Sequence, residues 1–282
     1  MMELGIFAKT FRRPDAQSTL EAVRSLGLGC VQFNFECAGL PSMPEEVPPP
    51  ALEAIAAASQ GTGVRLAAIS GTFNMAHPER DVRKRGLLRL RVVAEAAAHL
   101  GVPLVTLCTG TRDRENMWQP HPDNRSTEAL ADMLETMETA LTIAAQTGVT
   151  LAIEPEHANV IDVSGRARAL LDTLQARERL QIILDPANLL EQCRPQRDVL
   201  REAFDLLGAD LAIAHAKDRR TNGAVCPLGS GVVDFEEYFR LLHSAGFRGP
   251  VIMHGFEENR AAESTAFARA KLKETQTDHA SH

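Results

Sequence analysis

Four short apolar stretches in the second half of the chain each end on a residue that can bind a metal ion. They are Thr150–Glu154, Gln181–Asp185, Leu211–His215 and Val251–His254. Their lengths and their β-branched residues are typical of strands. Their last residues follow one another at intervals of roughly 30 to 40 residues, about the length of one strand–helix unit. This pattern constrains the chain to a fold in which strands and helices alternate.

The same alternation extends over the whole chain. Four more strand-like runs lie in the first half, at Leu4–Ala8, Cys30–Phe33, Val64–Ile69 and Leu104–Cys108. Segments with helical periodicity follow the runs, at Ala16–Leu26, Ala51–Gln60, Val82–Leu100, Thr127–Gln146, Gly165–Gln175, Arg197–Leu207, Phe235–Ala245 and Ala261–Lys273. Eight alternations predict an α/β fold, a single-domain (β/α)8 TIM barrel over residues 1–275, with 276–282 as a polar, disordered tail. An open doubly wound sheet is the alternative, but no GxGxxG motif follows the first strand-like run.

In such a barrel the C-terminal ends of the strands meet on one face, where barrel enzymes keep their chemistry. We therefore expect Glu154, Asp185, His215 and His254 to surround one point. Two carboxylates and two imidazoles without a thiolate favour one divalent ion, Mn²⁺, Zn²⁺ or Co²⁺ (Fe²⁺ is also suited), over Mg²⁺. A bound dication would stabilise an enediolate while a neighbouring carboxylate moves a proton.

Composition narrows the classes of partner. The net charge of −7 argues against a nucleic-acid partner, although local basic residues leave anionic small substrates open. The five cysteines are odd in number and form no CxxC pair, which is typical of a reducing compartment and not of a zinc ribbon. The sequence begins without a signal-peptide pattern and has no apolar stretch long enough to span a membrane. We expect a cytoplasmic protein without a membrane partner.

Several motifs resemble those of the sugar phosphate isomerases/epimerases, the xylose isomerase-like TIM barrels. They are SerGlyThrPheAsnMetAlaHisPro at 70–78, IleGluPro at 153–155, LeuAspProAlaAsn at 184–188, HisAlaLysAsp at 215–218 and GlySerGlyValValAspPhe at 229–235. The last two together are the most specific, and the glycines would let that loop fold tightly across the mouth of the site. The resemblance covers nearly the whole chain. It implies the same barrel and a metal-dependent reaction of a sugar.

The resemblance also implies a ligand set. In that family one metal is held by Glu, Asp, His and Glu from strands five to eight, so Glu154, Asp185 and His215 take the first three places. The fourth place holds His254 instead of Glu, and Glu257 is an alternative ligand and a candidate catalytic residue. Asn188 stands where the family often has His. Both departures suit an aldose–ketose isomerisation or a dehydration better than a 3-epimerisation that uses two carboxylates.

Other polar residues near the strand ends are candidates for binding substrate. We assign this role to His77, His157, Lys217 and Arg219, and expect Lys217 to pair with Asp218. Trp118, in the long loop after the fourth run, could stack on a sugar face.

The sequence thus predicts a metal-dependent isomerase or epimerase of a sugar, sugar phosphate or keto-acid, with Glu154 moving a proton between neighbouring carbons. The substrate would be a small polyhydroxylated carbonyl compound, and by the resemblance the protein would be a homodimer or homotetramer. A dehydratase of a polyol or keto-sugar is one alternative. A non-catalytic metal- or sugar-binding barrel is another. A DNA repair activity like that of endonuclease IV is disfavoured by the acidic charge and by too few His and Asp residues at the strand ends.

Overall fold

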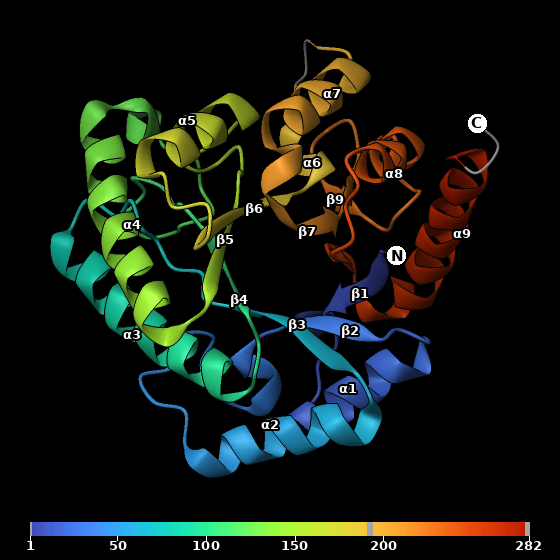
Figure 1. The fold of residues 1–282 in the computed structure, drawn as a ribbon, viewed down its shortest axis with the longest axis horizontal. Coiled ribbons are helices and arrows are strands. Elements are labelled where there is room, and N and C mark those ends of the chain that lie inside the picture. Colours follow the sequence, from blue (N-terminus) through green and yellow to red (C-terminus); the bar gives the residue numbers. More distant parts are fainter. Residues whose placement is uncertain (1, 191–193, 280–282) are drawn as a thin grey trace.

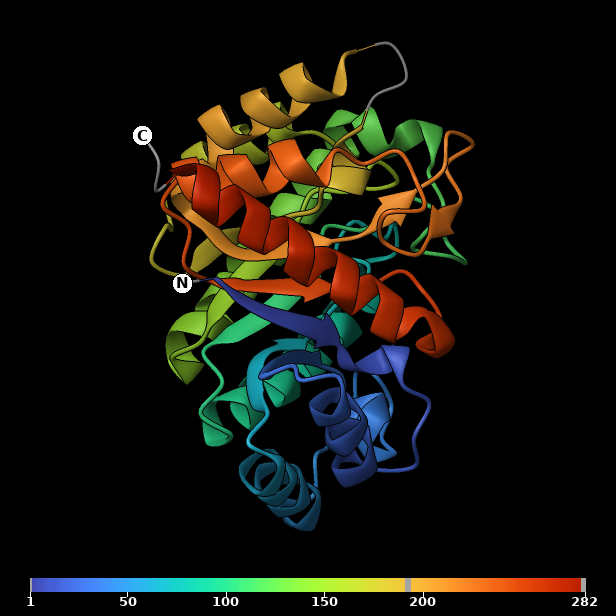
Figure 2. The same ribbon diagram turned by 90° about the vertical axis from the view of Figure 1, so that its right-hand side faces the viewer.

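Eight parallel strands close into a barrel in the computed structural model, which describes residues 2–190 and 194–279. Around the barrel they follow the order β1 (Glu3–Phe7), β10 (Pro250–Met253), β7 (Leu211–Ala216), β6 (Leu180–Leu184), β5 (Thr150–Glu154), β4 (Leu104–Cys108), β3 (Arg65–Ser70) and β2 (Cys30–Phe33). β1 closes the sheet by pairing with β10, beside which it lies in Figure 2. The predicted single-domain TIM barrel is confirmed, and the open sheet is excluded because these strands leave no edge.

Helices surround the barrel on its outside (Figure 1). They are α1 (Ala16–Ser25), α2 (Pro49–Thr62), α3 (Arg80–His99), α4 (Thr127–Thr147), α5 (Ser164–Leu174), α7 (Gln196–Leu207), α8 (Phe235–Ser244) and α9 (Ala261–His279). Helix α4 begins at Ser126, whose side chain accepts a hydrogen bond from the amide of Ala129, and it ends at Gly148 in the left-handed region. A serine N-cap and a left-handed glycine C-cap are common ends of an α-helix.

Several short elements lie outside the predicted pattern. The turn of helix α6 (Pro186–Leu189) follows β6, and β8 (Asp218–Arg219) pairs with β9 (Val225–Cys226) as a hairpin after β7. Short 3-10 helices lie at Ala8–Thr10, Phe35–Ala38, Pro122–Arg125, Gly208–Asp210 and Glu258–Arg260. Both α6 and the hairpin lie on the C-terminal side of the strands, where they add to the rim of the barrel.

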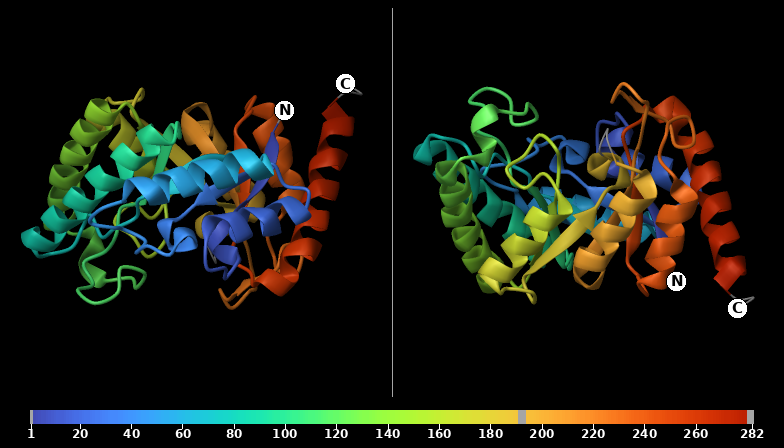
Figure 3. Two further views of the ribbon diagram at one scale, coloured as in Figure 1. Left: turned by 90° about the horizontal axis from the view of Figure 1, so that it is seen from below. Right: turned by 90° about the horizontal axis from the view of Figure 1, so that it is seen from above.

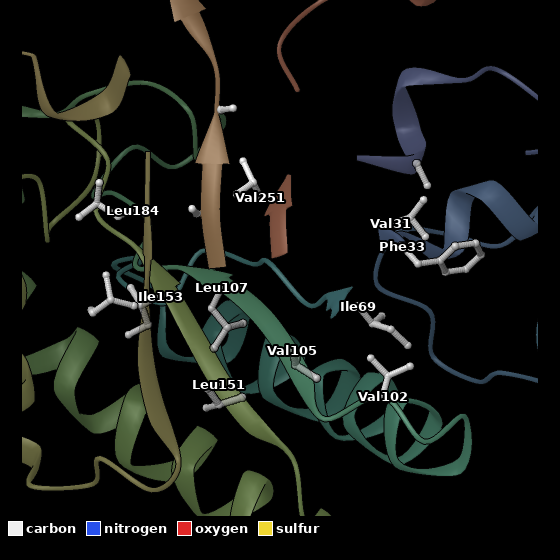
Figure 4. Packing of buried hydrophobic residues seen from close by; sticks show 14 of the residues in the cluster. Val31, Phe33, Ile69, Val102, Val105, Leu107, Leu151, Ile153, Leu184 and Val251 are labelled. Carbon is white, nitrogen blue, oxygen red and sulfur yellow. The ribbon is translucent and has the colours of Figure 1, made fainter. Parts of the chain in front are cut away.

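The strand pleat separates two layers of core. On β5, Leu151 and Ile153 belong to the large cluster between strands and helices (Figure 4), and Ala152 belongs to the small cluster inside the barrel. Each such buried aliphatic side chain contributes roughly 1.5–3 kcal/mol. Because side chains alternate with a period of two, Glu154 faces inward like Ala152. The same parity directs Gln32, Asp185, His215 and His254 inward, above Cys30, Ile183, Ile213 and Ile252 of the inner cluster.

Helix α9 continues through His279, so part of the predicted tail 276–282 is helical, and 280–282 lie outside the described residues. None of the helices in the described ranges is long and apolar enough to cross a membrane. Four cysteines, Cys30, Cys37, Cys108 and Cys226, are buried free thiols, and Cys193 lies outside the described residues.

Candidate metal centre

Four side chains converge where strands β5, β6, β7 and β10 end. Glu154, Asp185, His215 and His254 each offer one ligand atom, and these atoms all lie within 4.8 Å of one another. Glu154, Asp185 and His215 are buried, and His254 is partly buried. The structure therefore brings together all four residues that the sequence predicts as ligands, although their binding of an ion stays a prediction.

Contacts within the cluster pair each acid with an imidazole. Glu154 Oε2 lies 3.3 Å from Nδ1 of His215, and Asp185 Oδ2 lies 3.1 Å from Nε2 of His254. The two imidazole rings stand edge to face, with centroids 4.5 Å apart. Burial and the adjacent His215 lower the pKa of His254, so this ring is neutral at neutral pH and presents a lone pair.

The tautomer of His215 follows from Gln32 on β2. The amide nitrogen of Gln32 donates to Ser70 Oγ and Thr106 Oγ1, both at 3.2 Å, so its oxygen faces the histidine. That oxygen lies 2.8 Å from Nε2 of His215, which therefore carries the proton and donates it. Nδ1 of His215 is left with a lone pair directed into the cluster.

A cation fits this arrangement. Nδ1 of His215 is buried and makes no hydrogen bond to the described residues, although Glu154 Oε2 lies 3.3 Å away. A buried nitrogen of this kind is costly unless a Lewis acid or a proton meets it. The oxygens of Glu154 and Asp185 and a nitrogen of His254 lie around the same point. Two carboxylates would balance the two charges of the ion, and the imidazoles suit Mn²⁺, Zn²⁺ or Co²⁺ better than Mg²⁺.

A lysine and an amide brace the two acids. Lys217 Nζ lies 3.2 Å from Asp185 Oδ2 and donates to Asn188 Oδ1 at 2.6 Å. Asn188 in turn donates to Glu154 Oε1 at 2.7 Å. Burial opposes ionisation of Asp185, but Lys217 and His254 outweigh it and hold the pKa of this carboxyl well below its usual range. Burial likewise opposes ionisation of Glu154, but His215 and Lys217 keep its pKa low.

Lys217 does not form the ion pair with Asp218 that the sequence suggested. The buried Asp218 carboxylate instead accepts hydrogen bonds from four backbone amides, those of Arg219, Gly229, Gly231 and Val233, at 2.8–3.1 Å. A Cβ atom at Gly231 would lie 2.2 Å from Asp218 Oδ1, so only glycine lets the loop approach so closely. Asp218 thereby folds the glycine-rich loop back onto the β8–β9 hairpin.

A cavity of about 370 Å³ opens above the cluster. Its walls include Gln32, Asn34, Ser42, Ser70, Thr72, Thr106, Cys108, Glu154, Glu156, His215, Lys217 and His254. Trp118 and Val225 also line it, and about half of each side chain is exposed. They belong to the loop after β4 and to the β8–β9 hairpin, which project from the same side of the barrel in both views of Figure 3. A small polar molecule could reach the cluster between them.

Two titratable groups that line the cavity have raised pKa values. Burial, and secondarily the Glu154 carboxylate, raises the pKa of Glu156 to about 7. Burial and the same carboxylate raise the pKa of Cys108 well above its usual range, so it remains a thiol and is no nucleophile. Glu156 is thus a carboxyl group beside the ligands that changes charge near neutral pH.

The residues predicted to bind substrate lie in different places. Lys217 lines the cavity. The ring nitrogens of His77 are 3.2 Å from the carbonyl oxygen of Arg114 and 3.0 Å from the amide of Glu79, so they serve the loop. His157 is exposed outside the cavity lining, and Arg219 donates to the carbonyl of Leu190. Glu257 is also exposed, in a neighbouring cavity and outside the four-residue cluster.

Sequence reasoning missed the polar wall opposite the ligands. Gln32, Ser70 and Thr106 are inward-facing residues of β2, β3 and β4, joined by the Gln32 amide. The available signal was a polar residue inside an apolar strand run, as Gln32 is in CysValGlnPhe. Such a residue at an inner position near the C-terminal end of a barrel strand faces the site.

Comparison with known proteins agrees with this geometry. The family model described as xylose isomerase-like TIM barrel matches residues 20–274. The chain belongs to this family. No curated protein sequence matches this xylose isomerase-like barrel.

Solved structures similar to this xylose isomerase-like barrel share its fold at low identity. A 3-keto-D-glucoside 4-epimerase from E. coli is 20% identical, with a TM-score of 0.73 and coverage of 98% of this chain and 100% of that one. A D-psicose 3-epimerase from Clostridium cellulolyticum H10 is 17% identical, with a TM-score of 0.73 and coverage of 96% and 99%. A zinc-bound IOLI protein is 18% identical, with a TM-score of 0.71 and coverage of 98% and 97%.

Proposed function

We propose that this protein is a metal-dependent isomerase or epimerase of a small polyhydroxylated carbonyl compound. The observation that carries the proposal is the meeting of two acids and two imidazoles within 4.8 Å, where the buried Nδ1 of His215 makes no hydrogen bond to the described residues. The cavity above them is lined by hydroxyl and amide groups, which suit a sugar. The two similar sugar epimerases of known structure support the same class of reaction.

Each residue of the site has a separate role in the proposed reaction. A bound dication would supply positive charge that polarises a substrate carbonyl. Glu154, ionised and held at one oxygen by Asn188, removes a proton from the hydroxyl-bearing carbon next to that carbonyl. Return of this proton to the former carbonyl carbon, together with transfer of the hydroxyl proton to the former carbonyl oxygen, gives the isomer, and no atom is lost. Ser70 and Thr106 on the opposite wall would orient the substrate hydroxyls.

Isomerisation is favoured over epimerisation by His254. Epimerisation at one carbon needs a proton donor on the face opposite the base, and a neutral imidazole that binds the ion cannot act as a carboxylate base there. Isomerisation needs only one base, and Glu154 supplies it.

Metal analysis and isotope exchange test the proposal. The purified protein should hold close to one equivalent of Mn²⁺, Zn²⁺ or Co²⁺, and in D₂O it should place deuterium on a sugar carbon of at least one ketose or keto-acid. Glu154→Gln should abolish this exchange and preserve the fold, whereas Glu138→Gln, on the exposed face of α4, should leave it unchanged. Exchange retained in Glu154→Gln would remove Glu154 from the mechanism.

Dehydration of a polyol or keto-sugar is the second candidate. Dehydration also needs one base beside a metal. The presence of His254 in place of the family's Glu therefore does not impair it. The products separate the two reactions, because a dehydratase releases water and yields a product 18 Da lighter, whereas an isomerase conserves mass.

A further inference from the structure

A second cavity adjoins the one above the metal centre. Its volume is about 700 Å³, and it lies on the side of β1, β10 and the β8–β9 hairpin. It is lined by Phe7, Lys9, Thr10, Val225, Cys226, Pro227, His254, Gly255, Phe256, Glu257, Asn259 and Arg260. Five of these residues, Phe7, Lys9, Val225, His254 and Gly255, also line the inner cavity. The two cavities therefore adjoin at the candidate ligand His254.

From these two adjoining cavities we propose that the substrate is a two-unit sugar. Its reacting unit occupies the inner cavity, and a second, uncharged sugar unit occupies the outer cavity. The inference rests on the proposed function and names the class of substrate: a glycoside of a keto-sugar, in place of a free monosaccharide or a sugar phosphate.

The lining of the outer cavity suits a sugar ring. Phe7 and Phe256 offer apolar aromatic surface, against which the C–H face of a sugar packs. Thr10, Asn259 and Glu257 offer a hydroxyl, an amide and a carboxylate for the ring hydroxyls. Aromatic surface next to a few polar groups is the usual composition of a small-molecule site.

The charges of both cavities argue against a phosphate. Lys9 Nζ lies 2.7 Å from Glu36 Oε2, and a guanidinium nitrogen of Arg260 lies 2.7 Å from Glu263 Oε2. Lys217 is likewise engaged, by Asp185. Within the described part of the lining, each cation thus already has a carboxylate partner. A phosphate would have to displace one of them, whereas hydroxyl groups would not.

Gly255 and Val225 line both cavities where the two adjoin. Gly255 has φ +85°, and a Cβ atom there would lie 2.7 Å from Val225 Cγ1 and 2.8 Å from Lys217 Cγ. Glycine therefore lets the backbone leave β10 in close contact with the hairpin. The half-exposed Val225 side chain lies over this junction, where it can contact the bond that links two sugar units.

The test compares one-unit and two-unit sugars on the Mn²⁺-loaded protein. The probes are D-fructose and D-psicose, and their glucosylated counterparts such as maltulose, turanose and isomaltulose. Deuterium incorporation from D₂O gives kcat/KM, and calorimetry gives Kd independently of turnover. We expect at least one two-unit sugar to exceed the one-unit sugars tenfold in kcat/KM and in affinity.

Filling the outer cavity should remove this advantage. Asn259→Trp should lower the ratio of two-unit to one-unit kcat/KM at least tenfold, and Gln60→Trp, an equal change at an exposed position of α2, should not alter it. One-unit sugars handled as well as every two-unit sugar, or an unchanged ratio in Asn259→Trp, would overturn the inference and leave the proposed function intact. Binding of two-unit sugars without exchange into any sugar would support the outer site and contradict the proposed function instead.

Discussion

The amide oxygen of Gln32 lies 2.8 Å from Nε2 of His215, across the interior of the barrel from β2 to β7. This contact fixes both the ring orientation and the tautomer of the histidine, because Gln32 is itself held by Ser70 and Thr106. A ligand histidine whose other nitrogen donates to an oxygen is pre-oriented for its metal. Gln32 therefore controls the orientation of the candidate ligand His215 without being a candidate ligand itself.

Replacing Gln32 by Leu should weaken metal binding about 10- to 100-fold, the usual cost of losing such a partner. The ring of His215 would lose its orientation, and its Nε2 would be buried without an acceptor. Competition titration with a chromophoric chelator measures the affinity for Zn²⁺ or Mn²⁺. Gln60→Leu, at an exposed site, is the control. Equal affinity in Gln32→Leu and the natural protein would show that the contact does not matter.

The fourth ligand can be tested at His254. Because His254 joins the cluster and Glu257 lies outside it, His254→Leu should lower metal affinity at least tenfold, while Glu257→Gln should change it less than twofold. His254→Glu restores the pattern of the family and should retain the ion, since it again supplies an oxygen ligand. The chelator competition described for Gln32→Leu measures these affinities. If only Glu257→Gln lost affinity, Glu257 would be the fourth metal ligand.

Lys217 offsets the buried carboxylates when no ion is bound. Lys217→Met should destabilise the metal-free protein by about 3 kcal/mol or more, because it leaves Asp185 buried without its cation. Saturating Mn²⁺ should recover part of this loss, since the ion supplies positive charge at the same carboxylate. Urea unfolding with EDTA and with Mn²⁺ measures both values. Lys84→Met, at an exposed pair with Asp81, should cost under about 0.5 kcal/mol. A loss that Mn²⁺ leaves undiminished would contradict this account.

Glu156 predicts a pH dependence of stability. Its pKa rises on folding from an ordinary value of 4.5 to about 7, mainly through burial. Between these values the unfolded chain releases the proton and the folded chain keeps it, so the free energy of unfolding falls as pH rises and stays lower above pH 7. In metal-free protein, Glu156→Gln should gain about 1–3 kcal/mol over the natural protein at pH 8 and little at pH 5. Urea unfolding at both pH values tests this, with the exposed Glu46→Gln as the control. An equal gain in the free energy of unfolding at pH 5 and pH 8 would show that Glu156 does not titrate in this range.

The sequence was sufficient for the barrel and for the four residues that converge. A period of two and chemically distinctive last residues are properties of single strands, so they are visible locally. The contact of Gln32 with His215 joins positions 183 residues apart and depends on closure of the barrel, so no local pattern reveals it. The orientation of His77 was likewise hidden, because a loop has no periodicity to tell which way a side chain points. The β8–β9 hairpin has strands of two residues, too short to give a pattern.

The choice between His254 and Glu257 as the fourth candidate ligand shows where prediction from the sequence ends. Strand parity continues through β10 to His254 and directs it inward with Ile252. Beyond it the chain turns at Gly255, and parity ceases to apply, so the direction of Glu257 could not be inferred from the sequence. The backbone turn, and not the residue type, places Glu257 outside the cluster.

The ligand cluster and the wall that faces it come from different halves of the chain: the ligands from β5 to β10, the wall from β2 to β4. Mutations in the first half can therefore accumulate at Ser42, Thr72 or Trp118 and redirect the protein to a new substrate while the candidate metal centre keeps its geometry. Gln32 is excluded from that freedom, since changing it disturbs His215 on the other side. Over evolutionary time, drift in this barrel should leave Gln32 and its partners Ser70 and Thr106 fixed and the other residues of the wall variable.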